Sequence, residues 1–330
     1  SQDPALDERS EAYLEAILRQ QQLEAERARK WTINGTLAES YDDNVLITAD
    51  SDRDRGTATN LEAFRTMFMG SAKYRPIYEE TSEFAVQLDL MTMLSVDKTF
   101  QTTQTLTNSD PTVVGLTAPW THKGVFMGKG HKFDFVPGFE ATYMSIESNE
   151  WKMIYNSYLA GFQNMFFINE RWITNLNLEL RRDTSLLTSS TGDDNSTALK
   201  SKLTWSNINF LEDKKQIILS DLAYTSNNSL GKNSVFNRVD IGLGYVRPAF
   251  WDTTFSSKLG YFLLTYPENA TRRTDNSYSL TLGLTKKVSE KLSSSLLGTY
   301  NYNNSSVSAN QYKKFTMMLT LTASEVFWFA

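Results

Sequence analysis

Charged side chains that alternate with apolar ones are the residues of this sequence with the clearest chemical potential. Between positions 172 and 181, Leu178 and Leu180 alternate with Glu179 and Arg181. A period of two is that of a β-strand with one apolar face and one polar face. Charges of both signs on the polar face predict either internal ion pairs or a weakly selective aqueous passage, whereas a ring of one sign would predict ion selectivity.

The same alternation recurs from residue 31 almost to the C-terminus. If the apolar faces contact lipid, the charged residues between them point into the lumen of a barrel. The predicted lumen-facing charges are Arg65, Lys73, Asp89, Asp134, Glu140, Glu179, Arg181, Lys200, Lys202, Asp221, Arg238, Asp240, Lys258 and Lys314.

No group of residues predicts an enzyme, a cofactor or a metal site. The chain has no cysteine, which excludes a thiol nucleophile and a disulfide framework, and it lacks the nucleophile elbow, the P-loop and the dinucleotide fingerprint. Its two histidines, His122 and His131, flank a predicted turn at 126–130, but a metal needs more ligands than these. A net charge of −5 argues against nucleic-acid binding.

Turn signals divide the alternating region into about fourteen predicted strands, an even number as in single-chain bacterial barrels. No apolar run approaches the roughly 18 residues of a transmembrane helix. The face assignment is ambiguous only in the sixth strand. The predicted strands are residues 31–45, 60–77, 83–106, 112–125, 131–147, 151–166, 171–184, 197–210, 215–226, 234–248, 253–266, 276–287, 291–303 and 311–323.

The connections between these strands differ in length according to their parity. Those after even-numbered strands are short, such as MGKG and VSEK, whereas those after odd-numbered strands tend to be long and polar, with ESNE at 147–150 as the exception. Membrane barrels have short periplasmic turns and longer external loops. The pattern therefore predicts an outer-membrane location with both termini in the periplasm.

The stretch from Lys313 to Ala330 ends the chain with an amphipathic strand, KKFTMMLTLTASEVFWFA. Its apolar parity continues to Phe329 and is interrupted by Glu325. This stretch resembles the C-terminal signature of bacterial outer-membrane β-barrel proteins. The resemblance implies that the barrel insertion machinery recognises the last strand, which then pairs with the first.

A second, more distant resemblance covers about residues 31–330. GTLAESYDDNV, followed by YRPIY and then β-hairpins, resembles the fourteen-stranded barrels of surface lipoprotein assembly modifiers. Proteins of that family carry a periplasmic helical-repeat domain before the barrel, whereas here a single helix is expected. The departure puts lipoprotein translocation in doubt, and no site residue is carried over.

Residues 1–30 are predicted to form one amphipathic helix. Asp3 is a suitable N-cap, and cations end the segment, where the helix dipole favours them. Its short apolar stripe consists of Leu6, Tyr13, Leu14, Ile17 and Leu18. The helix either docks on a periplasmic partner, self-associates, plugs the lumen or has no specific role. Because the chain starts SQDPALDE without a signal sequence, we expect an exported protein in its mature form.

The sequence thus predicts an all-β transmembrane antiparallel barrel (residues 31–330) preceded by a periplasmic helix (residues 1–30). The expected function is a channel or export conduit in the bacterial outer membrane. The alternative is a non-conducting anchor subunit of an envelope-spanning, motility or secretion assembly. The expected partners are outer-membrane lipids, the insertion machinery and a periplasmic protein or second copy bound through residues 1–30.

Overall fold

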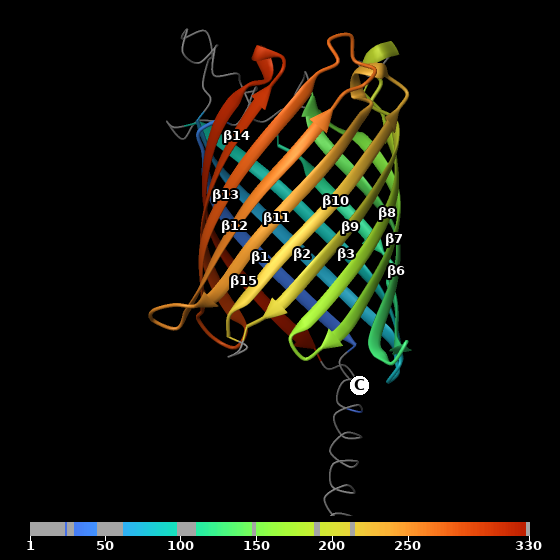
Figure 1. Cartoon of the computed structure of the whole chain (residues 1–330), viewed down its shortest axis with the longest axis vertical. Coiled ribbons are helices and arrows are strands. Elements are labelled where there is room, and N and C mark those ends of the chain that lie inside the picture. Colours follow the sequence, from blue (N-terminus) through green and yellow to red (C-terminus); the bar gives the residue numbers. More distant parts are fainter. Residues whose placement is uncertain are drawn as a thin grey trace, which may run out of the picture.

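The computed structural model describes residues 24, 30–44, 62–97, 110–146, 150–187, 192–211 and 215–327 (Figure 1). These residues form fifteen strands and three short 3-10 helices, η1 (Gly192–Asp194), η2 (Lys232–Ser234) and η3 (Ser308–Asn310). The strands are β1 (Trp31–Asp42), β2 (Ala63–Tyr78), β3 (Ser82–Asp97), β4 (Thr112–Thr117), β5 (Trp120–Phe126), β6 (Lys129–Ile146), β7 (Glu150–Asn169), β8 (Trp172–Ser185), β9 (Ala198–Phe210), β10 (Ile217–Ser229), β11 (Phe236–Pro248), β12 (Thr253–Thr265), β13 (Thr274–Lys287), β14 (Leu292–Ser305) and β15 (Tyr312–Phe327).

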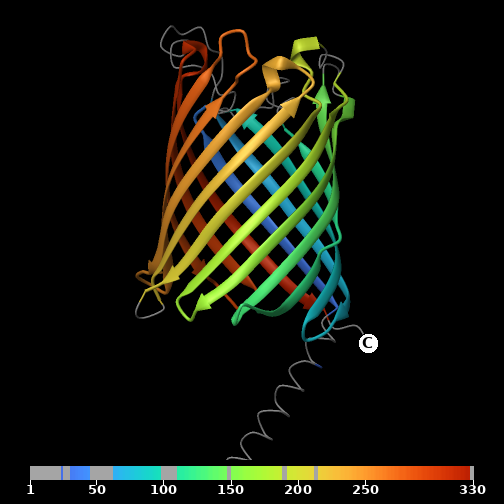
Figure 2. The same ribbon diagram turned by 45° about the vertical axis from the view of Figure 1, so that its right-hand side comes forward.

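All strands belong to one antiparallel sheet that closes on itself (Figures 1 and 2). Except for β4 and β5, which do not pair with each other, consecutive strands are paired, and β15 pairs with β1 to complete the ring. β4 and β5 both lie between β3 and β6, so together they occupy one position of the ring. The fold is therefore a closed barrel of fourteen strand positions, which confirms the predicted all-β antiparallel barrel.

The predicted strand at residues 112–125 is wrong, because the structure divides it into two strands, β4 and β5. Residues 112–125 were expected to form a single strand, but Ala118 and Pro119 separate β4 from β5. Proline has no backbone N–H to donate to a sheet. Here the backbone N–H of Ala118 donates to Pro137 O on β6, and Pro119 O accepts from Ala85 N on β3. The break thus keeps backbone links to both neighbouring strands. The predicted extension of the third strand to residue 106 lies outside the described residues.

The outer face of the barrel is apolar. Leu243, Leu259 and Leu319 project from the middle of their strands and keep 54%, 57% and 54% of their surface exposed. The most buried residues are small or polar, such as Ser157 and Asp275. This distribution is the inverse of that in a soluble protein, where large apolar side chains are buried.

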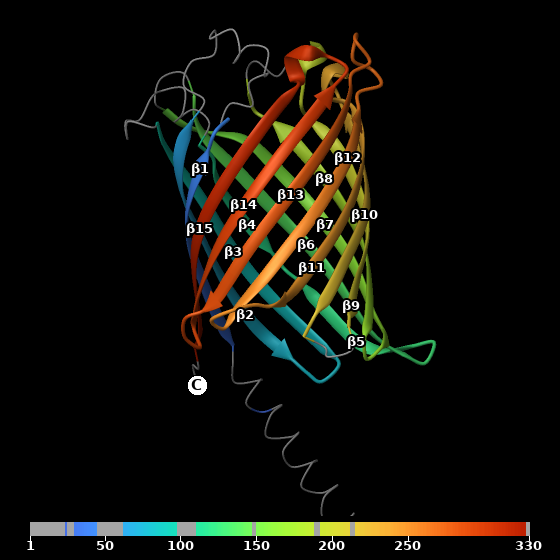
Figure 3. The same cartoon turned by 60° about the vertical axis from the view of Figure 1, so that its left-hand side comes forward.

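The seam between β1 and β15 is fixed by side chains as well as by the backbone (Figure 3). Ser324 Oγ donates to Asn34 Oδ1 at 2.6 Å, and the hydroxyls of Thr36 and Thr322 lie 3.0 Å apart. Near the opposite end of the seam, the buried carboxylate of Asp42 is a further contact point between strands.

Asp42 joins three strands through two cations. Its Oδ2 lies 2.7 Å from Lys314 Nζ on β15 and 3.6 Å from Arg65 Nη1 on β2, and its Oδ1 accepts from Asn44 N at 3.0 Å. Arg65 also donates to Ser95 Oγ on β3. A buried carboxylate is stable only when paired and hydrogen-bonded, and this one is both.

The two ends of the barrel differ. We call the end that carries η1, η2 and η3 the loop rim, and the end with the short turns after β5, β7, β11 and β13 the turn rim (Figure 1). At the loop rim, the connections after β8 and β10 are joined by backbone contact. Gly231 N donates to Asn195 O at 2.9 Å, and Asn233 Nδ2 donates to Asp194 Oδ1 at 2.8 Å.

We expect Gly231→Ala to separate these two connections. A Cβ at Gly231 would lie 2.4 Å from Asn195 N and 2.6 Å from Asp193 O. Both are backbone atoms, so a change of side-chain rotamer cannot relieve the clash. Such overpacking costs about 1–3 kcal/mol. Hydrogen exchange at residues 192–197 and 229–235 should become faster while the strands stay protected. The control is Gly35→Ala, because nothing lies within 4 Å of its Cβ position.

Of the predicted N-terminal helix, residues 1–23 and 25–29 lie outside the described residues, and so does the C-terminal end beyond Phe327. The predicted apolar stripe, Leu6, Tyr13, Leu14, Ile17 and Leu18, falls in the undescribed part. Within the part of the chain that the structure describes, no helix is long and apolar enough to cross a membrane.

Candidate functional site

The cross-strand register shows which predicted charges share a face. Leu178 pairs with Leu203, and both are exposed on the outer face. The neighbouring pair, Glu179 and Lys202, therefore occupies the opposite, inner face. The same parity places all the predicted charges on the inner face: Arg65, Lys73, Asp89, Asp134, Glu140, Glu179, Arg181, Lys200, Lys202, Asp221, Arg238, Asp240, Lys258 and Lys314. Their role in passage through the lumen remains a prediction.

Arg181 on β8 is the centre of the densest group of charges. It forms an ion pair with Glu140, which lies two strands away on β6. It also donates from Nε to Asp183 Oδ1 at 2.5 Å and from Nη2 to Ser157 Oγ at 2.9 Å. Lys200 Nζ adds a second cation, 3.3 Å from Asp183 Oδ2. The two cations and two carboxylates balance, so this group has no net charge.

Most other predicted charges are also paired. Lys73 Nζ lies 2.7 Å from Glu83 Oε1, and Lys258 Nζ lies 2.9 Å from Asp221 Oδ1. The remaining pairs are Asp134 with Lys132, Arg238 with Asp240, and Arg65 and Lys314 with Asp42. Ion pairing along the inner wall is thus extensive. Internal ion pairs were one of the two arrangements that the mixed charges predicted, the other being a weakly selective aqueous passage.

Three of the predicted charges have no ion pair among the described residues: Asp89, Glu179 and Lys202. Asp89 Oδ1 accepts only from Gln87 Nε2, at 2.8 Å. Glu179 and Lys202 are register partners on β8 and β9, yet no bond joins their side chains. Among the predicted inner-face charges, these three are the ones whose charge no described partner compensates.

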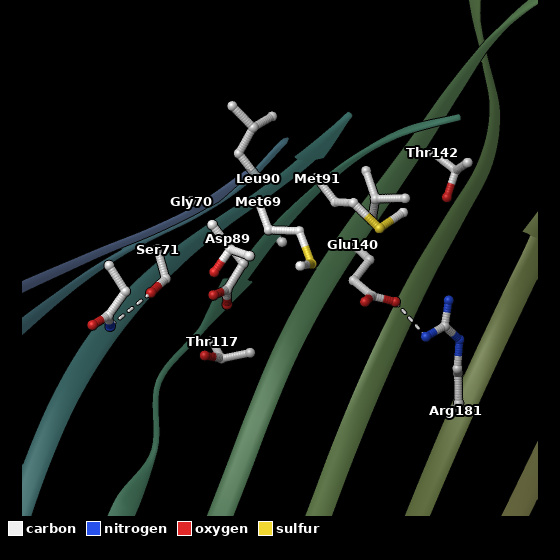
Figure 4. Close-up of a pocket in the computed structure, with 14 residues that line it drawn as sticks. Met69, Gly70, Ser71, Asp89, Leu90, Met91, Thr117, Glu140, Thr142 and Arg181 are labelled. Atoms are coloured by element: carbon white, nitrogen blue, oxygen red, sulfur yellow. Dashed lines mark hydrogen bonds and ion pairs between the residues drawn. The ribbon is translucent and has the colours of Figure 1, made fainter. Parts of the chain in front are cut away.

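Asp89, Glu140 and Arg181 line a cavity of about 610 Å³ inside the barrel (Figure 4). We call it the Asp89 cavity; its walls come from β1, β2, β3, β4, β6 and β8. Figure 4 shows Glu140 and Arg181 joined on one side and Asp89 on the other. Its volume lies in the range of small-molecule sites, roughly 300–1,000 Å³.

Methionines line the Asp89 cavity, and reasoning from the sequence missed them. Met69 on β2 pairs with Met91 on β3, and Met67 pairs with Met93 in the neighbouring row. All four lie on the inner face, and Met69 and Met91 reach the cavity. The signal was present in MFM and MTM, where methionine occupies the positions expected to be polar.

A second cavity, of about 460 Å³, lies toward the loop rim. Arg181 and Lys200 contribute to it together with Tyr155 and Tyr266. Burial raises the pKa of the Tyr266 phenol, so its hydroxyl stays protonated at neutral pH. The cavity therefore presents hydroxyl groups and paired charges.

The two histidines lie on the outer face near the turn rim. His122 pairs in register with Phe133, and His131 Nε2 lies 3.1 Å from Asn164 Oδ1. In the described ranges, no three histidine, aspartate or glutamate side chains are arranged to hold a metal ion. The expected absence of catalysis and of cofactors stays a prediction.

No model of a known protein family matches the chain, and no curated protein matches it. Solved structures that resemble it include OmpT, an outer membrane protein of Vibrio cholerae, with 10% identity, 89% of this chain and 97% of that chain covered, and a TM-score of 0.48. OpdQ of Pseudomonas aeruginosa has 11% identity over 91% and 99% of the two chains, with a TM-score of 0.43. OccAB3 of Acinetobacter baumannii has 9% identity over 90% and 99%, with a TM-score of 0.43.

Similarities of this size concern the barrel shape and carry no argument about function. None of the three is a surface lipoprotein assembly modifier, and that resemblance stays a prediction. The closed fourteen-position barrel is established by the chain's own register.

Proposed function

We propose that this protein is a channel or export conduit of the bacterial outer membrane, with the barrel interior as its passage. The observation that carries the proposal is the Asp89 cavity, which lies inside a closed ring and is bordered by charged side chains. A barrel of fourteen strands has a wider interior than the eight-stranded kind, which side chains fill. A polar inner wall is favourable only if water or a polar solute reaches it.

The outer face supports a membrane location. A barrel leaves no unpaired strand edge, which satisfies the requirement that lipid places on the backbone. The exposed leucines of the outer face would be costly in water and are favourable in lipid. We place the turn rim in the periplasm, because short turns face that side in outer-membrane barrels.

The partners follow from this placement. Outer-membrane lipids contact the outer face, and the insertion machinery engages β15 before it pairs with β1. Docking of a periplasmic protein or a second copy through residues 1–30, or plugging of the lumen by them, remains part of the proposal. The anchor alternative depends on the same residues, and no described contact favours it.

Conductance across a planar lipid bilayer tests the channel. We expect discrete current steps from the purified full chain. If it stays silent, the same measurement without residues 1–30 separates a plugged channel from a closed barrel. Silence of both forms would contradict the proposal and leave the anchor function.

Ion selectivity provides a sharper test of the passage. Lys202 faces inward without an ion pair, whereas Arg182 on the next strand faces outward, opposite Tyr158. Lys202→Glu should shift the reversal potential in a salt gradient toward cation preference, because a charge inside the lumen acts on every passing ion. Arg182→Glu makes the same change of charge outside and should leave the potential unchanged. Equal shifts would show that current does not follow the inner wall.

A further inference from the structure

We propose that the Asp89 cavity is a binding subsite for monovalent organic cations that carry an apolar group, such as an alkyl or aryl ammonium ion. The inference rests on the proposed channel, because the solute reaches the subsite through the lumen. It goes further by naming the chemical class of solute that this wall retains.

The charge of the cavity favours a cation. Asp89 and Glu140 supply two carboxylates, and Arg181 supplies one cation. Arg181 is committed to Glu140 and Asp183, so its charge is compensated. Among the described residues, Asp89 receives a single hydrogen bond, from the uncharged amide of Gln87. The nearest cation on the adjacent strand, Lys73, lies opposite Gln87 and is held by Glu83.

Gly115 leaves space beside the free carboxylate. It pairs in register with Asp89 on β3 and with Glu140 on β6, so it stands between the two acids on the inner face. A Cβ at this position would lie 3.6 Å from Asp89 Cβ and 3.7 Å from Glu140 Cγ. The absence of a side chain at Gly115 leaves the space between Asp89 and Glu140 open to the cavity, so a bound cation can approach the Asp89 carboxylate from this side.

One side of the cavity wall is apolar, whereas Asn34, Ser71 and Thr117 are among the uncharged polar residues elsewhere in its lining. Met69, Met91 and Val113 follow one another across β2, β3 and β4, directly beside the row that holds Asp89 and Gly115. In Figure 4 Met69 is drawn between Asp89 and Glu140, and Met91 is drawn next to Glu140. Thioether side chains are flexible and polarizable, and they adapt to apolar groups of different shapes. A small inorganic cation makes no use of this surface, whereas an alkyl or aryl group does.

Titration calorimetry of the full chain in detergent tests the subsite, with benzyltrimethylammonium as the probe. We expect Asp89→Asn to weaken binding about fivefold, the upper range for a partly exposed charge pair. The matched control is Glu179→Gln, another inward carboxylate without an ion pair that lies outside the cavity. It should leave the affinity unchanged.

Two further comparisons separate the charge from the apolar wall. Met91→Thr should weaken binding of benzyltrimethylammonium by at least about fourfold, because the change removes the thioether sulfur and its methyl group, which is more apolar contact than one buried methylene supplies. The same variant should not affect tetramethylammonium, which lacks the aryl group. Benzenesulfonate, an anion of similar size, should not bind. Retained β-structure and resistance of the folded band to SDS before boiling establish that each variant is folded.

The possible results distinguish a failure of the subsite proposal from a failure of the channel proposal. Equal effects of Asp89→Asn and Glu179→Gln, or equal binding of benzenesulfonate, would overturn the subsite. Conductance without binding of the probe would leave the channel standing and refute the subsite. Calorimetric binding with the expected variant pattern, in a barrel that does not conduct, would establish the subsite and refute the channel.

Discussion

Replacing Asp42 with alanine is expected to lower the free energy of unfolding by about 3–5 kcal/mol, the cost of removing one partner from a buried ion pair. The buried carboxylate holds Lys314 of the last strand and Arg65 of the second. Without it, two cations that are themselves mostly buried lose the carboxylate that they share at the barrel seam. The strand that carries both contacts, β1, is also the one that closes the ring.

Denaturant titration of the protein in lipid vesicles, followed by tryptophan fluorescence, measures this loss. The control is Asp221→Ala, which breaks a single pair with Lys258, a residue whose side chain is more than half exposed. Exposed pairs contribute about 0–1 kcal/mol, so the control should shift the midpoint much less. Similar shifts for both variants would show that Asp42 does not fix the seam.

Arginine at Leu203 should destabilise the protein in a membrane by about 2–4 kcal/mol, the cost of a cation on the lipid-facing side at the bilayer midplane. Leu203 lies in the middle of β9 and projects outward, 46% exposed, between Leu178 and Tyr224. Neither neighbour offers a counter-charge. The effect requires lipid around the barrel, so it tests the membrane location directly.

The adjacent residue supplies the control. Thr204 points inward, opposite Asn177 and Ala223. Thr204→Arg adds the same side chain one position along the same strand, but on the polar inner face. We expect less than about 1 kcal/mol from this change, in line with ordinary polar-surface substitutions. If both variants unfold at the same denaturant concentration, the outer face is not in contact with lipid.

The strands were predictable because apolar and polar residues alternate along a strand that has one apolar face and one polar face. Leu176, Leu178 and Leu180 suffice to locate β8 and to orient it. Glu179 and Arg181 follow from the same parity, and so do the other inner charges. The pairing of β15 with β1 was implied by the resemblance of the C-terminal stretch to that of outer-membrane barrels, and the register confirms it.

Other features depend on contacts between strands, which alternation does not encode. Pro119 interrupts its strand, but only the register shows that β4 and β5 keep the same neighbours. Met69 and Met91 were missed because alternation assigns apolar residues to the outer face, whereas the register places these two on the inner face. In β7 both faces carry large apolar residues, Leu159 and Phe162 among them, so the face assignment stayed ambiguous.

The sequence also did not predict which charged residues form ion pairs with each other. Arg181 reaches over β7 to Glu140, because the register places the inward Ser157 of β7, a small side chain, opposite Glu140. Nothing in the chain order links residues 140 and 181. The same holds for Asp42, which was not singled out and yet joins three strands.

The seam also sets the order in which this protein can fold. Ser324 and Asn34 are hydrogen-bonded although 290 positions separate them in the chain. Contacts of such long sequence separation form slowly, because the intervening chain must be ordered first. The ring therefore cannot close until the last strand has been synthesised. Until then β1 presents an open edge, the kind of surface that aggregates unless it is held. If the barrel functions in the outer membrane as we propose, another protein must cover this edge until β15 arrives.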